Sequence, residues 1–339
     1  RFPKEMESSL DTTNGFRLFS VESFDSNTPD NVIESPPIEG FVPRIAINVT
    51  NRHAADDFDF VGVPQSSVVG NYLTNNPKEN YIIGLLDTGA SICIMSYDGS
   101  KKVGINDNWL TENTVQIGGA TDTSFALVSM PLAIYMDGLS AIDPNTGFLD
   151  DSNMVGESNF SIAVGDVPAE GESGLPDVIG TPVSVYYVTS IRNENPVSVT
   201  YDGNNYTSPE IKFYDQYDTD IPYYENEITL NLKPLGAYDV EFTPSIDSVF
   251  NLEPEPGSPS MLVGLSSQSL FFMGSVDLFH GTRTSIDKQG FMLDTGAQVT
   301  VISTSIAARL GLNPAIPDFE VEIIDATGNV TYDPGFYIN

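Results

Sequence analysis

The sequence has few basic residues, few histidines and a single cysteine. Its 339 residues include 14 Lys and Arg against 47 Asp and Glu, which gives a formal net charge of −33. So small a basic content excludes nucleic acid as a natural partner, because a phosphate backbone requires a basic footprint. Cys93 alone cannot form an internal disulfide or a cysteine-based metal site. His53 and His280 have no partner motif, so neither a zinc site nor a Ser-His-Asp triad is predicted.

Long apolar runs are also missing. No stretch of eighteen apolar residues occurs, so the chain is predicted to contain no membrane-spanning helix. The excess of acidic side chains favours an extracellular or cell-surface location, where salt screens the repulsion between like charges. The alternative interpretation is that the negative charge only keeps the protein in solution.

The pattern that is present indicates a mainly β fold. From Phe41 onward, short apolar runs are bounded by Gly, Pro, Asn and Asp, and helical periodicity is scarce. The clearest helix is expected from Ser303 to Leu310, ended by Gly311. We expect an acidic irregular arm at 1–40, a first unit at 41–195, a connector with a Pro-rich linker at 196–259 and a second unit at 260–339.

One short segment occurs twice. The segments 82–96 and 289–303 both contain Asp-Thr-Gly-Ala after apolar residues, and both end in Ser, at an offset of 207 residues. Such a spacing is far beyond that of solenoid repeats and predicts two duplicated lobes. Asp and Gly are also common in ordinary turns, so turn chemistry alone is the competing interpretation.

The repeated segment suggests acid–base chemistry. If the lobes meet about a pseudo-twofold axis, Asp87 and Asp294 come face to face and share one proton, because two adjacent carboxylates cannot both ionise. One then takes a proton from water while the other supports a carbonyl oxygen. The hydroxyls of Thr88 and Thr295 either lock one loop to the other or satisfy local backbone groups. The predicted loop-locking and turn residues are Thr88, Gly89, Ala90, Thr295, Gly296 and Ala297.

These residues resemble the aspartic protease family, whose signature is two apolar residues followed by Asp-Thr-Gly. The alanines that follow each glycine are more similar to the retroviral-protease-like branch than to pepsin. The resemblance covers residues 80–191 and 289–339. It implies two β-barrel lobes related by a pseudo-twofold axis, with Asp87 and Asp294 as the catalytic pair, a polypeptide substrate and no required cofactor.

The resemblance also implies supporting elements around the two loops. Val178, Ile179 and Gly180 are similar to the apolar-apolar-Gly element that crosses behind the catalytic loop, although a plain core strand ending at a turn fits them too. Flap candidates, which a simple hairpin turn explains nearly as well, are Gly118, Gly119, Ala326, Thr327 and Gly328. No second apolar-apolar-Gly element follows the second motif before Asn339, so we expect the second lobe to be incomplete within this chain.

One acidic loop has the spacing of calcium ligands. Asp143, Asn145, Asp150 and Asp151 carry suitable oxygens but lack the glycine and distal glutamate of the full EF-hand pattern. An exposed acidic loop without metal is the alternative.

Two functions remain open from the sequence. The first is an aspartic endopeptidase that hydrolyses peptide bonds through a water activated by the Asp87–Asp294 pair. The second is a non-catalytic extracellular or cell-surface protein that keeps a protease-like scaffold for structure or binding, with possible self-assembly through an open strand edge.

Overall fold

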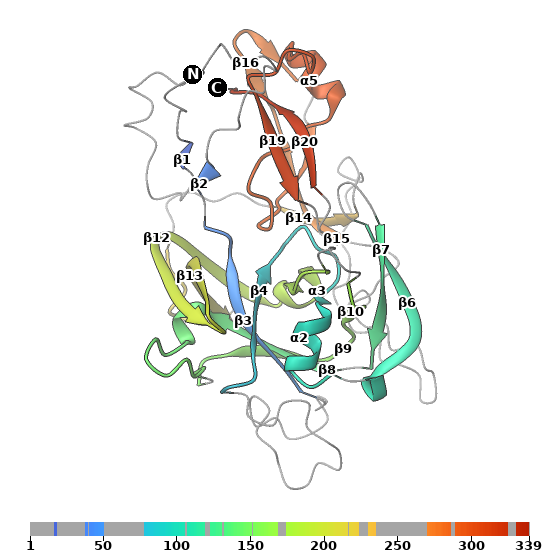
Figure 1. Ribbon diagram of the computed structural model, residues 1–339. Coiled ribbons are helices and arrows are strands. Elements are labelled where there is room, and N and C mark those ends of the chain that lie inside the picture. The colour runs from blue at the N-terminus through green and yellow to red at the C-terminus, as the bar shows by residue number, and fades with distance from the viewer. Residues whose placement is uncertain are drawn as a thin grey trace, which may run out of the picture.

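The chain is mainly β, as expected from its apolar pattern (Figure 1). None of the helices in the described part of the chain is long and apolar enough to cross a membrane. The computed structural model describes residues 17–18, 38–39, 41–50, 78–105, 107–118, 123–130, 132–150, 152–168, 174–215, 217–223, 230–234, 270–285, 289–324 and 330–338.

Nine strands form one mixed sheet in the order β6-β7-β10-β5-β11-β4-β3-β8-β9. The parallel pairs are β11 with β4 and β10 with β5, and the other neighbours are antiparallel. The strands are β3 (Arg44–Thr50), β4 (Ile82–Leu86), β5 (Ile94–Met95), β6 (Leu110–Gly118), β7 (Thr123–Ser129), β8 (Leu132–Gly138), β9 (Val155–Phe160), β10 (Ala163–Gly165) and β11 (Val178–Ile179).

The expectation of barrel-shaped lobes is wrong for the described residues, because their sheets are open. Strands β6 and β9 are the two edges of the large sheet and do not pair with each other. Closure requires matched, staggered strands all the way round. Instead, β6 carries exposed polar side chains such as Glu112 and a register shift between Leu110 and Thr114, features typical of a free edge.

Strands at the centre of this sheet are apolar on both faces. In β3, Ile45, Ile47 and Val49 join one buried cluster, whereas Ala46 joins another on the opposite face with Tyr135 of β8. Successive side chains of a strand point to opposite faces, so both faces of β3 and β8 must be covered. This explains why these strands are nearly continuous apolar runs.

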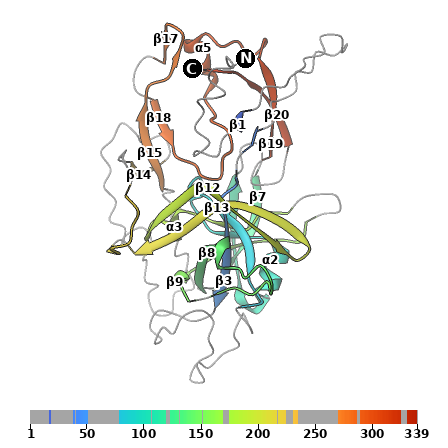
Figure 2. The ribbon, with the colours of Figure 1, turned by 90° about the vertical axis from the view of Figure 1, so that its left-hand side faces the viewer.

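A long two-stranded hairpin, the ribbon, consists of β12 (Tyr187–Tyr201) and β13 (Asn204–Asp215). It lies against β3, β8 and the short helix η3 (Leu139–Ala141), as Figure 2 shows from the side. The hydroxyl of Ser208 donates to the carbonyl of Arg44 and accepts from its N–H, which fixes the ribbon to β3. The ribbon therefore spans residue 195, where we expected a boundary, and packs on the large sheet.

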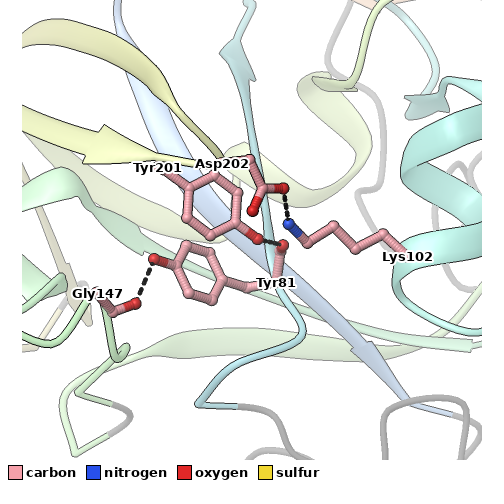
Figure 3. A network of polar contacts seen from close by, with 5 residues as sticks. All are labelled: Tyr81, Lys102, Gly147, Tyr201 and Asp202. Atoms are coloured by element: carbon pink, nitrogen blue, oxygen red, sulfur yellow. Dashed lines mark hydrogen bonds and ion pairs between the residues drawn. The ribbon is translucent and has the colours of Figure 1, made fainter.

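A polar and aromatic network anchors the tip of the ribbon (Figure 3). The rings of Tyr81 and Tyr201 stack with their centroids 4.4 Å apart, and the Tyr201 hydroxyl donates to the Tyr81 carbonyl. The Tyr81 hydroxyl donates to the carbonyl of Gly147 at 2.8 Å. Lys102, at the end of α2 (Tyr97–Lys102), pairs with Asp202 and lies over the Tyr201 ring. The network joins the ribbon, α2 and the start of β4.

The C-terminal part contains smaller sheets. Strands β14, β15 and β18 form a three-stranded sheet, while β16–β17 and β19–β20 are hairpins. Their bounds are β14 (Asn231–Pro234), β15 (Leu270–Val276), β16 (Phe279–His280), β17 (Arg283–Thr284), β18 (Gln289–Met292), β19 (Phe319–Ile324) and β20 (Val330–Gly335). The remaining elements are β1 (Arg17–Leu18), β2 (Ile38–Glu39), η2 (Asp107–Trp109) and α3 (Thr181–Ser184).

The expected helix near residue 303 is confirmed as α5 (Thr304–Leu310). The Ser303 hydroxyl accepts from the N–H of Ile306 at the N-terminus, and Gly311 ends the helix with a φ of 76°. A positive φ suits glycine because it lacks a Cβ. Ala307 and Leu310 of the helix form a small buried cluster with Leu312.

Candidate active site

The first Asp-Thr-Gly-Ala segment, residues 87–90, is called the first loop and follows a strand held on both sides. Strand β4 lies between β3 and β11, and its last residue, Leu86, is buried. The N–H of Asp87 donates to the carbonyl of Ile179 in β11 at 3.0 Å. Asp87 therefore leaves the sheet from a fixed backbone position.

The second segment, residues 294–297, is called the second loop and follows β18. That strand pairs with β15, and the N–H of Leu293 donates to the carbonyl of Phe272 at 2.9 Å. Strand β18 is an edge of its three-stranded sheet, so Asp294 is supported from one side by the described strands.

Each loop folds around its own aspartate. One carboxylate oxygen of Asp87 accepts the N–H of Gly89 at 2.7 Å. In the same way, one oxygen of Asp294 accepts the N–H of Gly296 at 2.8 Å and that of Ala297 at 3.1 Å. Asp residues commonly accept such bonds from the backbone two residues on, which explains the turn from local sequence alone.

Two threonines connect the loops by reciprocal hydrogen bonds. The Thr88 hydroxyl donates to the carbonyl of Leu293 at 2.7 Å and accepts from the N–H of Thr295 at 3.0 Å. The Thr295 hydroxyl donates to the carbonyl of Leu86 at 2.7 Å and accepts from the N–H of Thr88 at 3.0 Å. Of the two interpretations left open for these hydroxyls, the structure has them bridging the loops.

The glycines let the two aspartates approach each other. A Cβ on Gly89 would lie 2.4 Å from the carboxyl carbon of Asp294, and one on Gly296 would lie 2.6 Å from that of Asp87. No side chain fits at such distances. Glycine is required here by the opposing carboxyl group, which crosses over the neighbouring loop.

The two carboxyl groups lie close together, because each occupies the position that a Cβ on the other loop's glycine would need. Burial, the nearby charge of Asp294 and the hydrogen bond between the two groups together raise the pKa of Asp87 to about 7, against the lowering effect of the backbone N–H groups of Gly89 and Ala90. Adjacent carboxyl groups that interact in this way titrate as a coupled pair.

The predicted apolar-Gly element lies directly behind the first loop. Val178 and Ile179 form β11, parallel to β4 and antiparallel to β5. A Cβ on Gly180 would lie 2.5 Å from the carbonyl oxygen of Ala90, so the next residue can pass close to the loop. Thr181 then donates its N–H to that oxygen at 2.9 Å and its hydroxyl at 3.2 Å.

The first flap candidate is a hairpin whose residues near the turn share an apolar cluster with the first loop. Strands β6 and β7 pair up to Gly118, opposite Thr123, while Gly119 lies outside the described residues. Val115 and Ile117 belong to an apolar cluster that also contains Ala90. In the second unit the candidates Ala326, Thr327 and Gly328 fall outside the described residues, between β19 and β20.

The acidic loop considered for calcium uses its carboxylates as backbone caps. Asp143 accepts from the N–H of Asn145 at 2.7 Å and that of Thr146 at 3.3 Å, which lowers the pKa of this exposed carboxyl. Asp150 accepts from the N–H of Ser152, and Asp151 lies outside the described residues. Across the described part of the chain, no group of three or more His, Cys, Asp or Glu residues is arranged to hold a metal.

Two residues beside the first loop were not predicted from sequence: Thr181, described above, and Asp177. The Asp177 carboxylate accepts the N–H of Ser96 at 2.8 Å. Both residues flank the Val-Ile-Gly segment, and that adjacency is the only signal in the sequence that points to them.

One family matches part of the chain. Residues 286–337 match the family described as "gag-polyprotein putative aspartyl protease". The matched segment contains the second loop, α5 and the β19–β20 hairpin. Comparisons with curated proteins and with solved structures yield no match. This part of the chain is therefore similar to aspartic proteases of the gag-polyprotein type.

Proposed function

We propose that this protein is an aspartic endopeptidase, with Asp87 and Asp294 as its acid–base pair. The observation that carries the proposal is the contact between two carboxyl groups on loops that bind each other through reciprocal threonine bonds. A turn that served only to reverse the chain would not need a second carboxyl group within hydrogen-bond reach. The pseudo-twofold relation of two lobes is part of the same proposal.

The reaction uses water and the two carboxyl groups. With one proton on the pair, the ionised carboxylate accepts a proton from water as the water oxygen bonds to the carbonyl carbon of the peptide. The protonated carboxyl donates its proton to the carbonyl oxygen at the same time. The C–N bond then breaks as the nitrogen takes a proton from one carboxyl group and a hydroxyl of the tetrahedral intermediate gives its proton to the other, so that a carboxylic acid and an amine leave. The pair returns to its starting state with one proton.

Substrate and location follow from charge in this proposal. A chain with a formal net charge of −33 attracts basic or neutral polypeptide segments and repels acidic ones. We propose an extracellular or cell-surface setting, where salt limits the repulsion within the protein. Raising the ionic strength should reduce kcat/KM for a basic peptide more than for a neutral one of the same length.

The test is peptide hydrolysis by matched variants. Wild-type protein should cleave a mixture of peptides, and a hydroxyl-containing mimic of the tetrahedral intermediate should block cleavage. Asp87→Asn and Asp294→Asn should both abolish cleavage. Asp143→Asn is the control, because Asp143 is exposed and caps a distant turn. If the folded wild-type protein neither cleaves any peptide nor binds the mimic, the proposed endopeptidase function is wrong.

A specific observation favours the non-catalytic scaffold as second candidate. Around the second loop, Leu293 is 52% exposed and Val301 is 67% exposed. Exposed apolar side chains beside a site offer contact area to another chain if they form one continuous patch. A scaffold would keep the loop contact but leave peptides intact, and its Asp87→Asn and Asp294→Asn variants would be indistinguishable from wild type in every peptide assay.

A further inference from the structure

Asp177 connects the strands on either side of the first loop. It directly precedes β11, and its carbonyl accepts the N–H of Leu85 in β4, two residues before Asp87, at 2.9 Å. Its carboxylate accepts the N–H of Ser96, just after β5, at 2.8 Å and the Ser96 hydroxyl at 3.2 Å. Asp177 therefore bonds both to β4, which leads into the first loop, and to Ser96, which follows β5 on the other side of the loop.

The carboxylate of Asp177 packs closely against the backbone of α2 at Gly99. A Cβ on Gly99, in the first turn of α2, would lie 2.3 Å from one of its oxygens. The hydroxyl of Ser96 also accepts the N–H of Gly99 at 2.9 Å and so begins the helix. The chain leaves no room for a side chain where the carboxylate lies, so its bonds to Ser96 have a defined geometry.

We propose that Asp177 is a positioning residue for Asp87, an inference that rests on the proposed endopeptidase function. It holds the start of β11, and Thr181 holds the end of that strand through the carbonyl of Ala90. Between these two attachments, the carbonyl of Ile179 receives the N–H of Asp87 at 3.0 Å. Catalytic groups require placement within about half an ångström, and attachments of this kind supply it.

The second loop provides an internal comparison. Ser303 corresponds to Ser96 at the offset of 207 residues, and its hydroxyl likewise begins a helix by accepting the N–H of Ile306. Among the described residues, however, the side chain of Ser303 bonds to Ser305 and Ile306 and to no carboxylate. The cap is thus common to both copies, whereas the carboxylate attachment belongs to the first loop. A role limited to capping would not explain Asp177.

The test compares Asp177→Asn and Asp177→Ala with Asp98→Asn. Burial, and to a smaller extent the negative charge of Asp98, raises the pKa of Asp177; Asp98 is an exposed carboxylate in the same helix turn, so its removal controls for charge. Misplacing a catalytic group lowers kcat, and we expect a loss on the order of tenfold in Asp177→Ala with KM changed less than about twofold. Asp177→Asn, which keeps one oxygen acceptor, should recover part of kcat. Asp98→Asn should match wild type.

A second measurement does not depend on activity. Titration of the Asp87 carboxyl carbon by NMR should show its pKa moving down in Asp177→Asn, because the two loops relax and the carboxyl groups separate, and moving less in Asp98→Asn. Equal titration and equal kcat in these two folded variants would overturn the positioning role. If wild type proves inactive, the endopeptidase fails while the titration still decides the role of Asp177. If Asp177→Ala does not fold, the isosteric Asp177→Asn carries both measurements.

Discussion

The two loops have the same sequence and the same bond from the glycine N–H to the aspartate carboxylate, but their surroundings differ. Leu86, before the first loop, is 1% exposed, whereas its counterpart Leu293 is 52% exposed. After the loops, Ile94 lies in β5 at 5% exposure, whereas its counterpart Val301 belongs to no strand and is 67% exposed. The comparison shows that the Asp-Thr-Gly-Ala turn does not require a fully paired sheet. Local bonds and the reciprocal threonines are sufficient to form it.

Element β11 accounts for much of the difference. In the first copy it pairs with both β4 and β5 and receives the N–H of Asp87. Among the described residues, no strand has this position beside β18, which pairs with β15 alone. The segment 299–302 then has no strand partner in the described part of the chain. Similar apolar segments therefore give a buried strand in one place and an exposed segment in the other.

The largest expected effect is a loss of catalysis that is the same for both loops, although their surroundings differ. Asp87→Asn and Asp294→Asn should each lower kcat/KM by about 10³-fold or more, because acid–base catalysis of this kind contributes about 10²–10⁴-fold and each group is needed in turn. Steady-state hydrolysis of one peptide measures both. An effect confined to Asp87, in the better-supported loop, would show that the pair does not act as a unit.

The next largest effect concerns stability, because the side chains packed around the large sheet are buried in a larger cluster than those around α5. Ile134 lies in the largest buried cluster, whereas Leu310 belongs to a cluster with two other buried residues. Removal of a large buried side chain costs about 2–5 kcal/mol in the free energy of unfolding, and more where the surroundings cannot collapse. We expect about 4 kcal/mol for Ile134→Ala and about 2 kcal/mol for Leu310→Ala in urea unfolding. Equal losses would contradict the comparison.

The threonine bridge should instead be symmetric. Thr88→Val and Thr295→Val each remove two inter-loop hydrogen bonds and leave a partner N–H without its acceptor. A net hydrogen bond contributes about 0.5–1.5 kcal/mol, so each variant should lose about 2 kcal/mol of unfolding free energy. Thr→Ser at either position keeps the hydroxyl and serves as control. Losses that differ by more than about twofold would show that the bridge is not reciprocal in energy.

The smallest effect concerns the helix caps. Ser96→Ala and Ser303→Ala each remove an N-cap, which costs about 1 kcal/mol. Ser96 also donates its hydroxyl to Asp177, so its replacement should cost the more of the two in chemical denaturation. Should Ser303→Ala be the more destabilising, the bond to Asp177 contributes nothing to stability.

The sequence predicted the parts of this structure that depend on local chemistry. The repeated Asp-Thr-Gly-Ala located both loops, and Ser303 with Gly311 located α5, because caps and turns are set by neighbouring residues. Open sheets could not be foreseen, since pairing depends on contacts far apart in the chain. The ribbon was not recognised as a unit because its polar face resembles a connector, and Asp177 before β11 resembles any residue at the start of a strand.

The most direct test of the account is the titration of the two aspartates by carbon NMR. We predict that Asp87 releases its proton near pH 7 instead of near the ordinary value of about 4, and that Asp294→Asn lowers this pKa while burial keeps it above the ordinary value. Because the folded-state pKa is raised, the stability that this group contributes is complete below about pH 4 and is lost as the pH rises through about 7. Peptide hydrolysis should also decline as the pH rises through about 7. Two independent titrations near pH 4, unchanged by either asparagine, would contradict the shared proton.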